Sequence, residues 1–458
     1  MSLVPAAGDA SLTIAERRRA GRELRQQVPR RAHADWSPEP SRPDPVQTII
    51  DTGRHRIQKL LPIRYGRMRV NTFAFLRGSA AIMAADLATT PASGLVVQAC
   101  GDCHLANFGT YSSPEGTPVF DLNDFDETLA APFEWDLKRL AASFVVAARS
   151  RRMSDRRAGA LATAACRAYR ERIAELAGMD PLQAWRARID LAAALTAIGD
   201  LKLRDRETKR LQAAADAHRA GYPKLIERRR GDWRIKIALP YTFPLTDRHD
   251  RTLEFAARAA FRSYTASLRE EQRLIVARYQ LNDLAFKVVG VGSVGTFCAI
   301  ALFTTADGDA LLLQLKEAQR SVLAAYAGPS RFANQGERVV VGQRVMQAVS
   351  DPFLGWTDDD RDDRPCYVRQ LKDSRMAMVG ETLADAALDA HALLCGRALA
   401  RAHARSQDAG RLSGYMGSSG MLDTAVTEFA MAYADQTERD YRLFLEAIDS
   451  GLIEAAAP

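Results

Sequence analysis

Residues 285–303 read AFKVVGVGSVGTFCAIALF, and this stretch separates two architectures. Apolar, β-branched and aromatic residues stand on both sides of a run that contains Gly290, Gly292 and Gly295. This pattern predicts a strand, a glycine loop and a second strand. A dinucleotide-binding turn must open a helix instead, because the pyrophosphate binds at that helix's N-terminus. The β-rich second flank therefore argues against a dinucleotide fold.

Two interpretations of the loop remain. It is either a plain glycine-rich hairpin or a loop whose backbone N–H groups, around Ser293, cover the phosphates of a nucleotide as in kinases. The next strand, LLLQLKEA at residues 311–318, ends in Lys316, which fits the lysine that holds the α- and β-phosphates. A lysine at the end of an apolar strand is also commonly just solvated. We expect Glu337 on the following helix to pair with Lys316, with Glu317 as the rival partner.

An earlier segment, CGDCHLAN at residues 100–107, is compatible with several chemistries. The letters CGDCH have the spacing that attaches haem c, and a CxxC pair can also hold zinc or exchange disulfides. Haem attachment is disfavoured because the start of the chain has no apolar signal region. Zinc binding is disfavoured because no second Cys or His pair has zinc-ligand spacing. Asp102 and Asn107 have instead the D-x4-N spacing of a kinase catalytic loop, which predicts a base and a metal ligand.

A second metal carboxylate is expected a short hairpin downstream. VFDLNDFDE at residues 119–127 contains Asp121, Asp124 and Asp126. Acidic residues in a turn are often only turn residues. Asp124 is the predicted Mg²⁺ ligand, and the segment leaves open whether Asp121 or Asp126 shares that role.

These residues carry a resemblance. GDCHLAN resembles the GDLHPGN catalytic loop of aminoglycoside phosphotransferases and choline-kinase-like enzymes, and NDFDETLAAPFEWDLKRLA resembles their IDWGDAGVGDPAYDLA segment. The resemblance implies that Asp102 is the catalytic aspartate, that Asn107 and Asp124 bind Mg²⁺, and that Asp136 anchors the loop from beneath. Cys100 stands where those enzymes have a histidine. The chain also resembles, over about residues 45 to 450, an uncharacterised bacterial family catalogued as domain of unknown function 2252.

The order of the motifs departs from that of ordinary kinases. The glycine loop follows the catalytic loop by about 190 residues instead of preceding it. We therefore expect an α+β, protein-kinase-like, two-lobe fold in circularly permuted order, which closely spaced termini make tolerable. The predicted parts are a basic arm and linker (1–45), a helical lobe with the catalytic and metal loops (46–283), a β-rich nucleotide lobe with YVRQLKD as its hinge strand (284–373), and a helical remainder (374–458).

Composition sets the outer limits. The 458 residues are 47% hydrophobic and 26% charged, as in ordinary globular proteins. The sequence contains no run of 18 apolar residues, so we expect no membrane span. The net charge of +7 comes largely from arginine-rich runs, which read as solvated helix faces without a nucleic-acid motif. The scattered cysteines favour a reduced, cytoplasmic protein.

The predicted function is ATP- and Mg²⁺-dependent transfer of a phosphoryl group to a hydroxyl acceptor, a small molecule or a protein. The helical segment 150–270 is expected to form the acceptor pocket. Two alternatives remain at this point: a kinase-like regulatory protein that binds nucleotide without efficient turnover, and an enzyme that transfers AMP.

Overall fold

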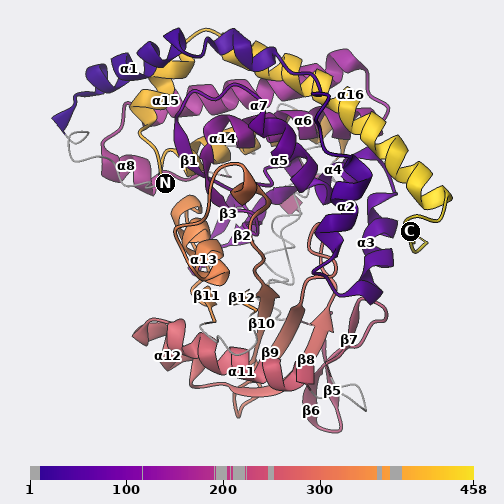
Figure 1. Ribbon diagram of the computed structural model, residues 1–458. Coiled ribbons are helices and arrows are strands. Elements are labelled where there is room, and N and C mark those ends of the chain that lie inside the picture. The colour runs from indigo at the N-terminus through magenta and orange to yellow at the C-terminus, as the bar shows by residue number, and fades with distance from the viewer. Residues whose placement is uncertain are drawn as a thin grey trace.

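The computed structural model describes residues 11–457 except 116, 190, 192–203, 207, 210–221, 223, 246–251, 358–363 and 372–383. Its described part has a mixed α+β architecture. A helical body occupies the upper part of Figure 1 and a twisted sheet the lower part. Segments from both ends of the chain build the helical body, which fits the interrupted order of motifs in the sequence.

The helical body contains the longest helices of the described chain. Its α-helices are α1 (Ile14–Glu23), α2 (Pro45–Gly53), α3 (Leu61–Met68), α4 (Thr72–Gly78), α5 (Ala80–Ala88), α6 (Phe133–Ser150), α7 (Asp155–Leu176), α8 (Pro181–Arg186), α14 (Leu388–His403), α15 (Ala409–Met416) and α16 (Met421–Asp449). Helices α6, α7, α14 and α16 pack together around the main apolar core. Ser154 caps α7 by accepting a hydrogen bond from the Arg157 N–H, as residues of its kind do at helix starts.

Short strands carry the loops at the lower edge of this body. They are β1 (Val96–Ala99), β2 (Phe108–Ser112), β3 (Pro118–Leu122) and β4 (Leu129–Pro132). β1 pairs with β4 and β2 pairs with β3, both antiparallel. The loop between β1 and β2 contains residues 100–107, and the loop between β3 and β4 contains Asp124 and Asp126. The two pairs therefore place the predicted catalytic and metal loops side by side.

The lower part is built on a six-stranded antiparallel sheet of order β11-β12-β10-β9-β8-β7. Its strands are β7 (Thr242–Pro244), β8 (Gln280–Lys287), β9 (Cys298–Thr304), β10 (Ala310–Glu317), β11 (Gly355–Trp356) and β12 (Cys366–Gln370). Helix α13 (Gln335–Met346) connects β10 to β11. The strands predicted on both sides of the glycine loop are thus present as β8 and β9, and Gly308 makes the next turn with φ of +92°.

The sheet lobe begins earlier in the chain than residue 284. A hairpin of β5 (Ile226–Arg229) and β6 (Asp232–Ile235), strand β7, and helices α11 (Thr252–Ser267) and α12 (Glu270–Val276) all precede it. Apolar residues of α11 such as Phe261 and Tyr264 share one core with the sheet residues Phe303 and Leu313. Burial of that helix face against the sheet explains why this helical sequence belongs to the β-rich lobe.

The arginine-rich segment at the start of the chain packs onto the helical body. α1 lies against α15, and the contact is close because each helix presents a glycine to the other. A Cβ on Gly21 would stand 2.1 Å from the Arg411 carbonyl oxygen, and one on Gly414 the same distance from that of Arg18. Within the described ranges, none of the helices combines the length and apolar character needed to cross a bilayer.

The proline-rich stretch after α1 is fixed by an ion-pair network. The Arg42 guanidinium donates to the carboxylates of Asp86 on α5 and Asp440 on α16, at 2.6–2.9 Å. Both aspartate side chains are only 3% exposed. A single arginine therefore bridges two buried carboxylates on helices from opposite ends of the chain.

We expect Arg42→Met to destabilise the fold by about 3 kcal/mol, because it leaves two buried carboxylates without their counter-charge. Urea unfolding at neutral pH measures this change. The matched control is Arg19→Met, which removes an exposed arginine 3.9 Å from Glu23 and should cost less than about 1 kcal/mol. Equal effects of the two substitutions would contradict the anchoring role of Arg42.

Candidate functional site

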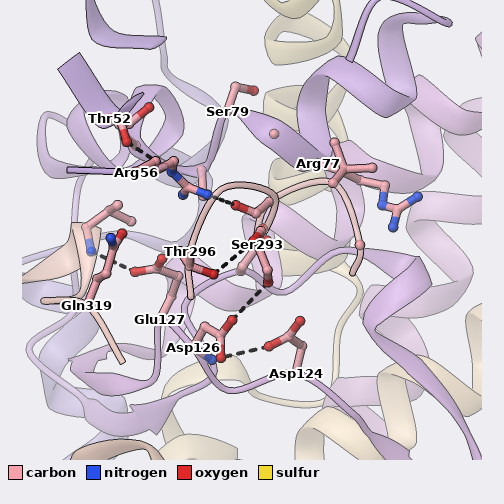
Figure 2. Close-up of a pocket in the computed structure, with 18 of the residues that line it drawn as sticks. Thr52, Arg56, Arg77, Ser79, Asp124, Asp126, Glu127, Ser293, Thr296 and Gln319 are labelled. Atoms are coloured by element: carbon pink, nitrogen blue, oxygen red, sulfur yellow. Dashed lines mark hydrogen bonds between the residues drawn. The ribbon is translucent and has the colours of Figure 1, made fainter. Parts of the chain in front are cut away.

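A cavity of about 510 Å³ lies where the sheet, the catalytic-loop segment and helices α2, α4 and α5 meet. Its lining includes most of the residues singled out in the sequence: Asp102, Asn107, Asp124, Gly290, Gly292, Ser293 and Lys316. Gly295 and Glu337 are not among the lining residues. Figure 2 shows Ser293 of the glycine loop pointing to Asp126, with Asp124 next to Asp126 and with Arg56 and Thr52 on the other side of Ser293. Segments separated by about 190 residues thus meet at one site.

Lys316 pairs with Asp126. Its Nζ lies 2.6 Å from Asp126 Oδ2, and the lysine side chain is only 2% exposed. Asp126 also accepts hydrogen bonds from the Tyr367 hydroxyl (2.6 Å) and the Ser293 hydroxyl (3.1 Å). Burial raises the carboxyl pKa of Asp126, but the Lys316 charge and the hydrogen bonds from Lys316 and Tyr367 together exceed this effect and lower the pKa to about 2. Asp126 is therefore ionised and joins the sheet to the β3–β4 loop.

Asp102 lines the cavity and is paired with a buried arginine. Arg139 on α6 donates from Nε to Asp102 Oδ1 at 2.6 Å and from Nη2 to the Leu76 carbonyl oxygen at 2.9 Å. Burial raises the pKa of Asp102, and the neighbouring Arg139 charge opposes that rise. His104 Nε2 lies 3.7 Å from the other carboxylate oxygen. Burial also lowers the pKa of His104 well below its usual value, so this histidine is neutral at pH 7.

The two predicted metal ligands present oxygen atoms. Asn107 Nδ2 donates to the Asp102 carbonyl oxygen at 2.6 Å, which leaves Oδ1 as the atom able to bind a cation. Asp124 is half-buried, and its Oδ1 accepts a hydrogen bond from the Asp126 N–H at 3.3 Å. Carboxylate and amide oxygens are ligands that suit Mg²⁺. The donor set of Asn107 and Asp124 therefore fits this ion.

Asp121 has a different role. It is fully buried and its carboxylate binds Arg401 at 2.5 Å and the Ala348 N–H at 2.7 Å. Asp121 does not line the cavity, whereas Asp126 does. Of the two carboxylates that the sequence left open, only Asp126 is placed to assist Asp124.

Asp136 supports the loop of residues 100–107 from below. Its two carboxylate oxygens accept hydrogen bonds from the Cys100 N–H (2.7 Å) and the Gly101 N–H (3.0 Å). His403 Nε2 lies 3.2 Å from the same carboxylate. A left-handed φ of +83° at Gly101 lets the backbone turn there, close to the Glu127 carbonyl.

The cysteines flanking Asp102 belong to the core. Potential ligand atoms of Cys100, Cys103 and Asp136 lie within 4.8 Å of one another, which is the geometry a metal would need. The Asp136 oxygens are already used by backbone N–H groups, and burial raises the pKa of both thiols, that of Cys103 to about 11. Protonated, buried thiols are packing groups. This arrangement agrees with the interpretation that disfavoured haem and zinc.

The glycine loop is held by arginines that the sequence gave no reason to select. Arg56 Nη1 donates to the carbonyl oxygens of Gly292 (2.6 Å) and Val294 (2.7 Å), and Arg67 donates to that of Gly290. Gly290 and Gly295 have φ values of +61° and +90°. Both positions therefore require the left-handed conformation that favours glycine. No local motif marks Arg56 or Arg67, because their targets lie more than 200 residues away in the chain.

The expected partner of Lys316 is not Glu337. Helix α13 reaches the site through the neighbouring Arg338, which is 2% exposed and donates to the carbonyl oxygens of Thr128, Asp126 and Gln319. The rival Glu317 accepts a hydrogen bond from the Phe297 N–H instead. The β3–β4 loop provides Asp126 as the carboxylate that pairs with Lys316. Helix α13 therefore holds that loop in place through Arg338 and does not supply the counter-charge for Lys316.

Segment 150–270, which the sequence predicts to form an acceptor pocket, does not reach the cavity with any of its described residues. Part of that segment lies outside the described residues. The opposite wall is formed by α2, α4 and α5, from residues 48–56 and 77–82. The described helix of 150–270 nearest in sequence to the loops, α7, is buried in the main core, and α11 is buried against the sheet.

A family model for bacterial proteins, described as "Uncharacterized protein conserved in bacteria (DUF2252)", matches residues 56–447. The chain belongs to this family. The match includes Arg56, the two acidic loops, the glycine loop and Lys316, but it leaves out α1, α2 and the lining residues of α2 such as Thr52. Neither the curated proteins nor the solved structures contain a match.

The Asp126–Lys316 pair predicts a defined response to acid. A carboxyl group whose pKa is lowered by folding stabilises the protein above its unfolded pKa near 4, and loses this contribution as the pH falls toward about 2. The contribution corresponds to about 2 kcal/mol. Between pH 5 and pH 2, the free energy of unfolding should therefore fall more steeply for the wild type than for Asp126→Asn. The free energy of unfolding is measured by urea unfolding at each pH. If it falls with the same slope for the wild type and Asp126→Asn, the ion pair with Lys316 does not lower the pKa of Asp126.

Proposed function

We propose that this protein is an ATP- and Mg²⁺-dependent phosphotransferase with a circularly permuted kinase-like fold. The observation that carries the proposal is the meeting of Gly292, Lys316, Asp102, Asn107 and Asp124 at one cavity. A nucleotide–metal unit must touch all of these groups at once in a kinase-type site. Their separation along the chain makes a chance meeting of this set a poor explanation.

The order of elements in the sheet lobe supports the proposal. Strand β8, the glycine loop, β9, the lysine strand β10, helix α13 and two further strands follow one another in the chain. Protein kinases use this order for their glycine loop, lysine strand and αC helix. The register places Lys316 opposite Tyr367 on β12, the strand expected to continue into the hinge.

The far end of α14 supports the permutation. After this helix, the Ser406 hydroxyl accepts a hydrogen bond from the Gln98 N–H, and Gln407 Nε2 donates to the Val96 carbonyl oxygen. The chain that leaves α14 thus lies beside β1, which leads into the catalytic loop. In an unpermuted kinase-like chain the corresponding helix would continue directly into that loop. The end of α14 and the start of the 100–107 loop would thus remain neighbours in space, although the permutation has removed the direct chain connection between them.

The chain's own residues supply the chemistry as follows. The acceptor hydroxyl oxygen attacks the γ-phosphorus, the bond from that phosphorus to the β–γ bridging oxygen breaks, and ADP leaves. Asp102 accepts the hydroxyl proton, a role that its raised pKa assists. Lys316 and the backbone N–H groups of the glycine loop hold the phosphates. Arg139 keeps the Asp102 carboxylate oriented.

The oxygen ligands described above would bind the metal. Mg²⁺ bound by Asn107 and Asp124 would neutralise charge on the phosphate oxygens. Asp126 is engaged by Lys316, Tyr367 and Ser293. Asp126 therefore serves first to position the lysine and the glycine loop.

Lys316→Ala should weaken binding of ATP–Mg²⁺ by about tenfold or more, because a buried positive charge on the phosphates is lost and Asp126 is left unpaired. Isothermal titration calorimetry of the full chain measures this affinity. Lys287→Ala, on strand β8 of the same sheet and outside the cavity lining, is the matched control and should bind as the wild type does. Absence of any ATP–Mg²⁺ binding by a folded wild type would overturn the proposed function.

Asp102→Asn and Asp124→Asn should fail in different ways. Asparagine at 102 keeps an oxygen for Arg139 but loses basicity, so nucleotide affinity should survive while turnover falls by about 10²- to 10⁴-fold. Asparagine at 124 replaces a charged ligand by a neutral one, so Mg²⁺-dependent nucleotide binding should weaken. ATP hydrolysis, with water as the acceptor, and calorimetry together separate the two effects.

Two outcomes would contradict this division of roles. If both variants hydrolyse ATP at the wild-type rate, the carboxylates are structural. If the wild type releases AMP and pyrophosphate-derived products in place of ADP and phosphate, the transferred group is adenylyl. Thermal unfolding of each variant shows whether a loss of activity comes from a loss of fold.

A further inference from the structure

The wall of the cavity opposite the acidic loops carries buried arginines. Arg56, which follows α2, and Arg64 on α3 both line the cavity. Three acids act electrostatically on Arg56, and each has another partner. The Val322 N–H donates to Glu127, Lys316 binds Asp126, and the Phe297 N–H donates to Glu317. This wall therefore differs in charge from the side that is proposed to bind Mg²⁺.

Arg64 is a buried cation without an acidic partner. It is 2% exposed, and its guanidinium donates to the Thr52 hydroxyl and to the carbonyl oxygens of Gly78 and Ile49, while its Nε has no hydrogen-bond partner. Among the described residues no carboxylate forms an ion pair with Arg64 or with Arg56. Burial and the neighbouring Arg56 charge lower the pKa of Arg64 to about 9. Buried charges in proteins are normally paired, so these two lack a counter-ion.

A helix N-terminus faces the same part of the cavity. Helix α5 begins at Ala80, and Ala80 and Ala81 both line the cavity. The preceding Ser79 does not cap the helix, because its hydroxyl donates to the Leu76 carbonyl oxygen. Within the described structure, the N–H groups of Ala80 and Ala81 have no hydrogen-bond acceptor. Free N–H groups at a helix start bind anions, and here they lie next to Gly78, to which Arg64 donates.

This part of the cavity adjoins the proposed base. The single Arg139 guanidinium binds both Asp102 and the Leu76 carbonyl oxygen near the end of α4. Asp102 and the junction between α4 and α5 are therefore close enough for one guanidinium group to bind both. In phosphoryl transfer the acceptor must present its hydroxyl to the base. We therefore expect the acceptor, and not the phosphates of the nucleotide, to bind in the part of the cavity next to Asp102.

We propose that the acceptor substrate is anionic and that its phosphate or carboxylate group binds between Arg56, Arg64 and the N-terminus of α5. The inference deepens the proposed phosphotransfer and rests on it for the role of Asp102. The bound anion neutralises the two guanidinium groups and accepts hydrogen bonds from the N–H groups of Ala80 and Ala81. It holds the rest of the acceptor between this wall and Asp102.

The test is calorimetric titration of the full chain with inorganic phosphate, with and without a saturating non-hydrolysable ATP analogue and Mg²⁺. The wild type should bind phosphate equally well in both conditions. Arg64→Gln should weaken phosphate binding by about tenfold or more. Ala81→Glu places a carboxylate at the helix start, so it should abolish phosphate binding while raising the melting temperature. Arg54→Gln removes an exposed arginine outside the lining and should bind phosphate as the wild type does.

Three results would overturn the anionic acceptor: binding of neither phosphate nor acetate by the wild type, displacement of the bound anion by the nucleotide analogue, or wild-type anion affinity in folded Arg64→Gln and Ala81→Glu. Displacement would assign the arginines to the nucleotide's own phosphates and leave the proposed function intact. Phosphate binding by a wild type that binds no nucleotide would instead overturn the proposed function. Titration with acetate distinguishes the two sources, since tighter binding of phosphate identifies a phosphorylated acceptor and tighter binding of acetate a carboxylic acid.

Discussion

The ion pair between Lys316 and Asp126 is the contact on which the site depends. It joins the lysine strand of the sheet to a loop 190 residues earlier, and its lysine side chain is almost entirely buried while that of Asp126 is partly exposed. A buried lysine in that position requires a carboxylate, because an unpaired ammonium would cost several kcal/mol. The pair therefore fixes how the sheet lobe sits on the helical body, and with it the position of the glycine loop above Asp102 and Asp124.

Further contacts secure the same arrangement from each side. Arg338 binds the backbone of the loop that carries Asp126, Tyr367 donates to the Asp126 carboxylate, and Arg56 holds the glycine loop. Most of these partners are backbone carbonyl oxygens, which specify position without adding negative charge to the cavity. Most acidic residues of the lining lie on the loops where a metal–nucleotide unit would bind, with Asp51 on α2 and Glu317 on β10 in addition. Arg56 and Arg64 add positive charge to the opposite wall.

Local patterns in the sequence predicted the elements better than their partners. Period-two alternation with glycine and Asp-Gly turns identified β8, β9 and β10, and the spacing of Asp102, Asn107 and Asp124 identified three cavity residues. The pairing of Lys316 with Asp126 could not be read in this way, because it depends on how two distant segments pack. The same holds for Arg56, Arg139 and Arg64, whose roles arise from burial. The mixed helical and strand sequence at 226–276 joined the sheet lobe for a similar reason, since its apolar face is complementary to the sheet.

The most direct test of the central claim is a crystal structure of the full chain with Mg²⁺ and a non-hydrolysable ATP analogue. The account predicts phosphates beneath the glycine loop, with Lys316 on the phosphate oxygens and the metal bound by Asn107 and Asp124. It also predicts that the terminal phosphate faces Asp102 across open space bounded by α4 and α5. A nucleotide bound outside this cavity, or a metal that contacts neither Asn107 nor Asp124, would contradict the account.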